Sequence, residues 1–406
     1  MDESFTADSS EIAGLSKLAT QIGEDAGVGC RLVLHHTAPF GDFDGELMRL
    51  LSTPLQTYTD VTYRRYANLA SDCATTGMHL NRAAWMYHDQ EKRNYDALNA
   101  HSEMSIVDMS PYNSENPISG PAVPYDSPAE FKPANAVDFP PPQSATDDIR
   151  KVIAESAGWV GDVDNGFKIV TGWSPLERLV APLSGNWNEL KRIGDAYKTG
   201  GDGIEKCGLN LEDGTKRVGE SWDGLAAQSF DGYSRKLSEA LKWEGPHGRV
   251  VKEILYVLSD QIRRGVESAL RFLERKLDDQ VQITDGTSAM KWVLRRVPYA
   301  GPSIITVELV SAAFSTAQKV QEIVDDIRVL VECLKEFLDL VTSPSGKLSE
   351  MSERLLAPVV DTLDDAKKKT ELGLSIAGVA DAEGVLNTPK TGYNPGTGRD
   401  PWADAV

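Results

Sequence analysis

The sequence predicts an all-α protein, in which long antiparallel helices pack as hairpins into an elongated bundle. Over several long segments the apolar residues recur at steps of three and four, the period of a helix with one buried face. Only the segment CRLVLHH, at Cys30–His36, has a strand-like pattern. With 406 residues, the chain is long enough for two or three domains and a sizeable core.

Charge and hydropathy narrow the range of partners. The formal net charge of -19 argues against a nucleic-acid backbone or an anionic membrane surface as the main partner, because both are negatively charged. No run of about 18 apolar residues occurs, so we expect no integral membrane segment. The acidic beginning of the chain lacks the basic and then apolar pattern of a secretory signal peptide. Export would therefore need a leaderless route.

Sequence motifs for metal, redox or hydrolytic chemistry are missing. The four cysteines are far apart and form no CxxC pair, so we expect small buried hydrophobes, with a Cys30–Cys73 disulfide as the alternative. The richest imidazole cluster has spacings that fit one helix face poorly; its members are His35, His36, His79, His88 and Asp89. There is no GxSxG, P-loop or HExxH motif. We expect a protein without cofactor, metal or catalytic residues, and therefore not an enzyme.

The first hundred residues predict a helical hairpin. A first helix begins at Asp8 or Ser9, either of which can cap it, and Glu11 can complete a capping box. The glycines and the proline of the following stretch are expected to end that helix. A second, longer helix is expected from about Glu46 to Ala100.

Residues 105–145 are polar, small and proline-rich, which predicts a semi-rigid linker. Helical patterns return at about residue 147. The apolar seam from Leu190 to Val218 keeps its phase across a glycine-rich stretch, so we expect one continuous helix despite a cost of about 1 kcal/mol per glycine. Separate helical stripes follow at Phe230–Leu241, Val251–Leu273 and Val310–Val341. A short last helix is expected over roughly Leu348–Ala380.

The segment Trp222-Asp223-Gly224 separates two of these stripes and predicts the turn of a helical hairpin. Glycine supplies backbone freedom at a tight reversal, and a tryptophan can cover the end of the bundle. The two alanines that follow allow close helix packing, and an aromatic residue then returns to the seam. This WxG turn comprises Trp222, Gly224, Ala226, Ala227 and Phe230.

The WxG turn resembles the WXG superfamily of type VII (ESX) secretion substrates, in which the motif joins two antiparallel helices. A second motif strengthens the resemblance. YHDQE, at Tyr87–Glu91, matches the YxxxD/E export signal associated with these substrates. Tyr87 and Glu91 stand at positions i and i+4, so they share one helix face and can form a small readable patch. A purely structural interpretation stays open, in which Tyr87 ends the seam and Glu91 is merely solvated.

The order of these motifs resembles EspB-like proteins, in which PE-like and PPE-like helical units are fused in one chain. The resemblance implies that the YxxxE and WxG motifs lie near each other at one end of an elongated bundle. Residues 8–245 carry the resemblance, but the chain has no Pro-Glu or Pro-Pro-Glu signature and its linker is long. The first hairpin equally resembles small secretion-associated ESX proteins, so the branch of the superfamily stays open.

The last long stripe carries a second apolar row, which one helix facing one partner does not need. We expect this row to be an assembly seam, covered either by the last helix or by a second copy of the chain; it comprises Ile323, Leu330 and Phe337.

The sequence thus predicts the following units: a hairpin at 1–104, a linker at 105–145, a WxG hairpin at 146–248, a long-helix bundle at 249–382 and a disordered tail at 383–406. The expected function is that of a non-enzymatic type VII secretion substrate or secretion-associated protein, exported folded to the medium or cell surface. Its expected partners are the secretion machinery (the ESX ATPase or a chaperone), a small helical WXG-type partner, or a second copy of the chain. Two alternatives are the delivery or adaptor head of a toxin or effector system, with a separately encoded partner, and a cytosolic helical scaffold.

Overall fold

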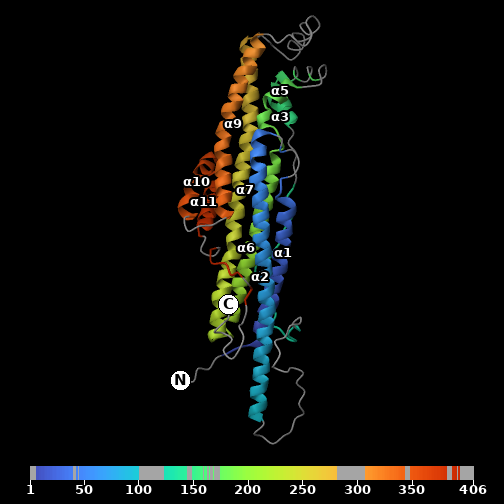
Figure 1. The fold of residues 1–406 in the computed structure, drawn as a ribbon, viewed down its shortest axis with the longest axis vertical. Helices are drawn as coiled ribbons and strands as arrows, with labels where there is room; N and C mark the ends of the chain where they lie inside the picture. Colours follow the sequence, from blue (N-terminus) through green and yellow to red (C-terminus); the bar gives the residue numbers. More distant parts are fainter. Residues whose placement is uncertain are drawn as a thin grey trace.

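The computed structural model is an elongated bundle of long helices, which confirms the predicted all-α class (Figure 1). In the part of the chain that it describes, the one β-type pairing is an isolated bridge. The described residues are 6–39, 43, 45–99, 123–143, 149–158, 160–161, 164, 168, 174–280, 307–342, 348–381, 386–390 and 392–393. No helix among these residues is both long enough and apolar enough to cross a membrane.

Helices α1 (Ser9–His36) and α2 (Glu46–Asn99) form the N-terminal hairpin. Asp8 caps α1, because its carboxylate accepts hydrogen bonds from the backbone N–H groups of Ser10 and Glu11. The side chain of Glu11 does not close a capping box; it binds Arg217 on another helix. The bounds of α2 agree closely with the predicted helix.

The glycines after the first predicted stripe do not end the first helix, which continues to His36 and stops shortly before Pro39. The segment Cys30–His36 is helical and belongs to α1, so it is not a strand. Gly29 lies inside the helix because the ring of Phe139 packs against it: a methyl group there would lie 2.7 Å from that ring. All four cysteines are buried and free, so there is no Cys30–Cys73 disulfide.

Helices α6 (Asn188–Val218) and α7 (Leu225–Gln280) form a second antiparallel hairpin beside the first. The predicted continuity of α6 across Gly200–Gly203 is confirmed. Close contact with neighbouring segments explains why α6 has glycine at several positions. A methyl group on Gly201 would lie 2.3 Å from the backbone oxygen of Glu244 in α7. The two helices can therefore approach closely only because the side chain is missing.

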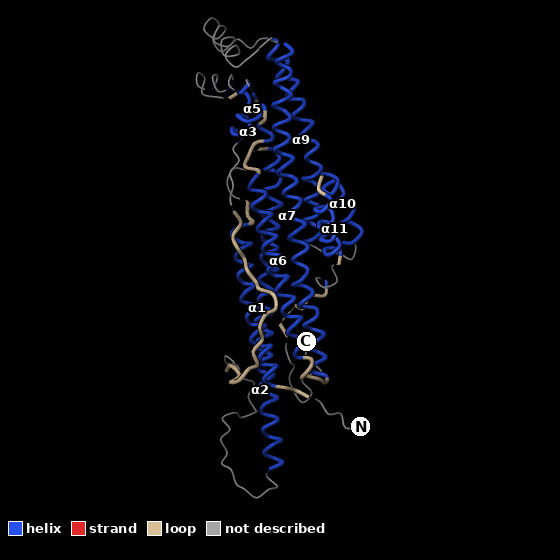
Figure 2. The backbone as a smooth tube through the Cα atoms, turned by 180° about the vertical axis from the view of Figure 1, so that it is seen from behind, coloured by secondary structure: helices blue, strands red, loops and turns tan. Residues whose placement is uncertain are grey.

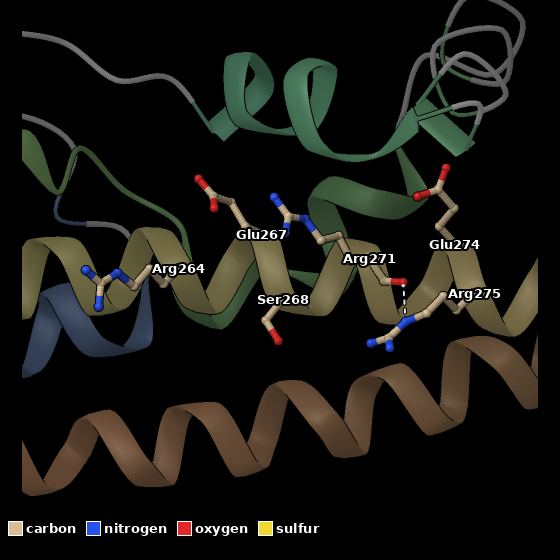
Figure 3. Close-up of a pocket in the computed structure, with 6 residues that line it drawn as sticks. All are labelled: Arg264, Glu267, Ser268, Arg271, Glu274 and Arg275. Carbon is tan, nitrogen blue, oxygen red and sulfur yellow. Dashed lines mark hydrogen bonds between the residues drawn. The ribbon is translucent and has the colours of Figure 1, made fainter.

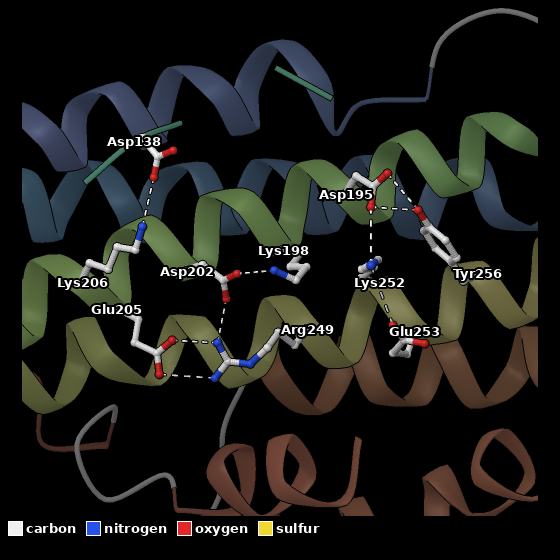
Figure 4. A network of polar contacts seen from close by, with 10 residues as sticks. All are labelled: Asp138, Asp195, Lys198, Asp202, Glu205, Lys206, Arg249, Lys252, Glu253 and Tyr256. Atoms are coloured by element: carbon white, nitrogen blue, oxygen red, sulfur yellow. Dashed lines mark hydrogen bonds and ion pairs between the residues drawn. The ribbon is translucent and has the colours of Figure 1, made fainter. Parts of the chain in front are cut away.

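Hydrogen bonds and ion pairs join α6 and α7 beside the apolar seam between them (Figure 4). Arg249 of α7 binds both Asp202 and Glu205 of α6, at 2.6 and 2.7 Å. Farther along, the hydroxyl of Tyr256 donates to the carboxylate of Asp195 at 2.9 Å. These groups are partly exposed, so they fix the register of the two helices more than they add to stability.

Helix α7 is one helix of 56 residues and does not stop near residue 248. The predicted boundary between units 146–248 and 249–382 therefore falls inside a helix, and the two expected stripes Phe230–Leu241 and Val251–Leu273 are one element. The intervening GPHG sequence stays helical because Gly248 packs tightly on the backbone of Tyr197 in α6. Pro246 fills space beside Gly378 of the C-terminal hairpin.

Short elements and three further helices complete the bundle. The segments α3 (Ile149–Ser156), α5 (Pro175–Leu179) and the 3-10 turn Ala181–Leu183 contact α7 or α9 (Val307–Thr342). The predicted last helix is in fact two: α10 (Leu348–Thr362) and α11 (Ala366–Ala380). They form a small hairpin on the side of α7 and α9, and Asp365 caps α11 (Figure 1).

The predicted assembly seam on α9 is covered within the chain, as in the first of the two alternatives, although α7 and α2 contact α9 in addition to α10. Leu330 is 7% exposed and Phe337 is fully buried in the apolar core. Ile323 is partly buried and lies against Gly265 of α7. Helices α7, α2 and α10 all contact α9, which explains why it needs two apolar rows.

A buried polar group lies where the two apolar clusters of the core meet. One cluster joins α7 to α9, and the other joins α1 to α6 and the beginning of α7. Between them, Arg65 of α2 makes a bidentate ion pair with Glu244 of α7, whose side chain is 0% exposed. His247 stacks on Trp243, at 4.9 Å between ring centroids, and burial lowers the pKa of its imidazole to about 3.

Part of the predicted linker is a docked strap. Residues 123–143 run extended alongside α1 and α6 and contact both helices (Figure 2). Their aromatic rings occupy the space that a side chain would take at glycine positions: Phe131 lies against Gly14 and Phe139 against Gly203. The rest of the predicted linker that falls in 100–122 and 144–148 lies outside the described residues.

Polar contacts hold the strap in register. The backbone N–H of Asn135 donates to the side-chain oxygen of Asn210, and Asn210 donates back to the backbone oxygen of Asn135, both at 2.9 Å. Arg217 pairs with Glu11 and lies 4.0 Å from the centre of the Phe131 ring. The strap therefore connects the two hairpins, whereas the composition alone predicted a spacer between them.

Candidate functional site

The WxG turn lies at one end of the bundle, where α6 stops and α7 begins. Gly224 has a φ of +91°, a backbone conformation that favours glycine, and its carbonyl accepts a hydrogen bond from Gln228 in the first turn of α7. The glycine of the motif is therefore required by the turn itself.

The beginning of the chain pairs with this turn. Ala7 forms an antiparallel bridge with Trp222. The N–H of Asp8 donates to the Ser221 carbonyl at 3.0 Å, and the N–H of Asp223 donates to the Thr6 carbonyl at 2.9 Å. Backbone hydrogen bonds on both sides of Trp222 thus fix the position of its backbone.

Trp222 and Tyr87 contact each other directly. The indole Nε1 of Trp222 donates a hydrogen bond to the hydroxyl of Tyr87 at 3.1 Å, and the two rings meet edge to face at 6.1 Å. Trp222 is 3% exposed and also packs on Phe230, at 5.5 Å between centroids. The expectation that the YxxxE and WxG motifs lie near each other is thereby met at their aromatic residues.

Glu91 lies one turn beyond Tyr87 on α2, and its side chain is exposed. Tyr87 is half-buried and packs against the apolar cluster that contains Trp222; burial raises the pKa of its phenol. We call the surface formed by Tyr87, Glu91 and Trp222 the composite patch. It combines the partly exposed Tyr87 with the exposed carboxylate of Glu91 one helical turn away, and the buried Trp222 holds Tyr87 in place.

The remaining residues of the WxG turn are structural. Phe230 is buried behind Trp222, and Ala226 and Ala227 are partly buried against the same apolar cluster. Leu225, which opens α7, is 61% exposed and had no assigned role.

Sequence reasoning missed two groups beside the composite patch. Trp85 and Asn81 both donate hydrogen bonds to the carbonyl of Val123, at 2.9 Å, and so tie the beginning of the strap to α2. Tyr125 then packs on the rings of Trp85 and His88. A tryptophan on the outer side of a long helix was the available signal for this contact.

The second missed group is Tyr393, which falls in the region predicted to be a disordered tail. Its side chain is fully buried, and its ring packs against those of Phe230 and Tyr233. Residues 386–390, 392 and 393 are described, so the prediction of disorder is wrong at Tyr393; the rest of the tail beyond it lies outside the described residues.

Elsewhere on the described surface, an open groove of about 620 Å³ lies on α7 (Figure 3). Its lining alternates in charge: Arg264, Glu267, Ser268, Arg271, Glu274 and Arg275. Because acidic and basic side chains alternate, the groove favours neither an anion nor a cation. Among the described residues, no three His, Cys, Asp or Glu side chains are placed to hold a metal ion. The composite patch is therefore the strongest candidate site.

A comparison of the chain with protein-family models, curated proteins and solved structures found no match.

Proposed function

We propose that this protein is a non-enzymatic substrate of a type VII (ESX) secretion system, exported in its folded state and acting through helix–helix contacts. The observation that carries this proposal is the hydrogen bond between Trp222 and Tyr87. It unites, in one surface, the two short motifs that resemble the export signals of that class. Neither motif alone is specific enough to support the proposal.

The construction of the composite patch favours export after folding. Tyr87 and Trp222 are 135 positions apart in the sequence and come from different hairpins. An unfolded chain would present the two motifs separately, so a receptor that needs both can bind only the folded protein.

The partner that we propose for the patch is the secretion machinery, either the ESX ATPase or a chaperone that delivers to it. The exposed carboxylate of Glu91 beside the partly exposed Tyr87 suits a partner with a basic group and an apolar pocket. A small helical WXG-type partner would fit the same end of the bundle.

The proposal is tested by expressing the protein in a bacterium with a type VII system and in an otherwise identical strain that lacks its ATPase. We expect the protein in the culture medium of the first strain alone, without cleavage, while a cytosolic marker stays inside both. Equal release from the two strains would reject the proposal, and absence from both media would favour a cytosolic scaffold.

Glu91→Gln tests the patch within the first strain. It removes a charge from an exposed side chain and leaves the aromatic contacts in place, so we expect export to fall while the melting temperature stays unchanged. The matched control is Glu336→Gln, which makes the same change at an exposed position of α9. Normal export of Glu91→Gln would show that the carboxylate is merely solvated, and it would reject the role of the composite patch. Co-purification of a toxin or other effector with the exported protein would favour the adaptor alternative.

A further inference from the structure

Tyr393 is a buried aromatic side chain in the tail after α11, and it contacts α2 and α7, which are far from it in the sequence. It is 0% exposed, and its ring lies 5.1 Å from Phe230, edge to face, and 5.5 Å from Tyr233. Aromatic pairs at such distances add to the stabilisation that burial alone provides. The tail therefore makes a specific contact with α7 at this residue.

Backbone contacts show that the docking of the tail is well fitted. The N–H of Tyr393 donates to the hydroxyl oxygen of Thr76 on α2, and the Thr76 hydroxyl donates to that of Tyr233, both at 3.2 Å. A methyl group on Gly392 would lie 2.4 Å from Cβ of Thr75. The tail thus contacts α2 and α7 together and bridges the two hairpins.

A continuous series of contacts leads from Tyr393 to the composite patch. Tyr393 packs on Phe230, Phe230 packs on Trp222, and Trp222 donates its hydrogen bond to Tyr87. Phe230 is therefore held between the tail and Trp222. Without Tyr393, Phe230 would face a cavity on that side and could change its rotamer, since packed side chains give way into empty space.

We propose that Tyr393 is a positioning residue for the composite patch: the docked tail orders Phe230 and Trp222, and thereby sets Tyr87 in the orientation that the secretion machinery binds. This inference rests on the proposed function. It follows that the patch is complete only when the chain has been synthesised through Tyr393. A truncated or nascent chain would carry both motifs and yet be a poor substrate.

The test compares two truncations that differ by one residue: a chain ending at Tyr393 and a chain ending at Gly392. Two point variants accompany them, namely Tyr393→Ala and the conservative Tyr393→Phe. The first readout is export in the ATPase-containing strain relative to the ATPase-deficient strain. The second is the ¹⁹F NMR signal of Trp222 in protein labelled with 5-fluorotryptophan, which is assigned with Trp222→Phe.

We expect the chain ending at Tyr393 and Tyr393→Phe to keep both the Trp222 signal and the export of the full chain. The chain ending at Gly392 and Tyr393→Ala should show a shifted or broadened Trp222 signal and a several-fold loss of export, with unchanged helical circular dichroism. If either of these two fails to fold, Gly392→Ala takes its place, because its clash with Thr75 displaces the tail and keeps the tyrosine. The same shift and loss are expected from it.

An unchanged Trp222 signal in Tyr393→Ala would overturn the inference, whatever happens to export. A shifted signal with normal export would also overturn it, and if Glu91→Gln were blocked in the same assay, the proposed function would stand. Normal export of Glu91→Gln would instead reject the role of the composite patch, and the inference would fall with it.

Discussion

At the residue scale, the composite patch depends on one indole nitrogen. Trp222 is almost completely buried, and Tyr87 is the hydrogen-bond partner of its Nε1. A buried N–H group that loses its acceptor costs about 1–3 kcal/mol, while removal of a packed aromatic ring costs about 3–5 kcal/mol. Polar and apolar contributions of this one side chain can thus be separated by substitution.

We expect Tyr87→Phe to lower the free energy of unfolding by about 1–3 kcal/mol, because it deletes the acceptor and keeps the ring. Trp222→Ala should lower it by about 3–5 kcal/mol. Urea titration followed by circular dichroism measures both. Identical midpoints for Trp222→Ala and the unmodified protein would mean that the indole is exposed in solution.

Asp72 of α2, next to the docked tail, makes the stability of the protein depend on pH. Burial raises the pKa of its carboxyl to about 6, above the 3.8 of an exposed aspartate. Because the folded protein binds this proton more tightly than the unfolded chain does, ionisation of Asp72 opposes folding. The penalty is absent below about pH 4 and grows as the pH rises through 6.

We therefore expect Asp72→Asn to be more stable than the unmodified protein by up to about 1 kcal/mol at pH 7.5, a figure that allows for the partial exposure of the side chain. The advantage should disappear at pH 4. Thermal unfolding at the two pH values measures the difference. An advantage of equal size at both would contradict the raised pKa.

At the element scale, glycines determine how closely the helices of this bundle pack. Along α6 they face α1, α7 and the strap in turn, and side chains or backbone from these elements occupy the missing Cβ positions. Sequence reasoning treated glycine as a helix breaker near Gly29, and it divided α7 into two stripes on either side of Gly248; both glycines are contact surfaces. It treated α6 correctly because the apolar phase could be followed on both sides of Gly200–Gly203.

Gly201→Ala should destabilise the protein by about 1–3 kcal/mol, because the new methyl group would meet the backbone of Glu244 and force α6 away from α7. Gly232→Ala in α7 is the matched control. Nothing lies within 4 Å of a methyl group there, so we expect a gain of about 0.5–1 kcal/mol from the better helix propensity. Denaturant midpoints of both variants provide the comparison, and equal effects would contradict the role assigned to Gly201.

The helices could be predicted from the sequence, and the segments that dock on them could not. The apolar periodicity gave α2 and α9 nearly complete, because a buried helical face repeats every three or four residues. The strap at 123–143 and Tyr393 have no period. Each is held by an aromatic ring packed among helix side chains and by a few hydrogen bonds of its backbone. Such contacts can be recognised only when the positions of both partners are known.

The same reasoning explains how much of the candidate site was foreseen. The residues of the two motifs were identified, and a resemblance implied that they meet. The support of Trp222 by Thr6–Asp8 on one side and by Phe230 and Tyr393 on the other was not foreseen. Short irregular segments carry no signal of where they bind.

At the scale of the whole molecule, α7 joins regions that the sequence divided into separate units. It contacts α6 along one part of its length and α9 and α11 along another. The second apolar row of α9 is buried by these contacts within the chain. Self-association, if it occurs, must therefore use another surface.

Leu330→Glu consequently tests folding and not assembly. Placing a carboxylate in the core should lower the melting temperature sharply or prevent folding, because a buried charge without a partner is strongly unfavourable. Val329→Glu, one residue earlier at a position that is 56% exposed, should leave the melting temperature nearly unchanged. Light scattering of both variants completes the test: a folded Leu330→Glu protein that only dissociates would restore the assembly seam.

The described chain begins at Thr6 and ends at Tyr393, and both lie beside the WxG turn, at the same end of the bundle (Figure 1). A reporter or affinity tag inserted beside either of these two residues would consequently crowd the composite patch, and moving it from one to the other would not relieve the crowding. Labels for localisation or pull-down experiments belong near the opposite end, at exposed positions of α9 such as Phe314. A fusion that failed to leave the cell would otherwise be misread as a protein that the secretion system does not accept.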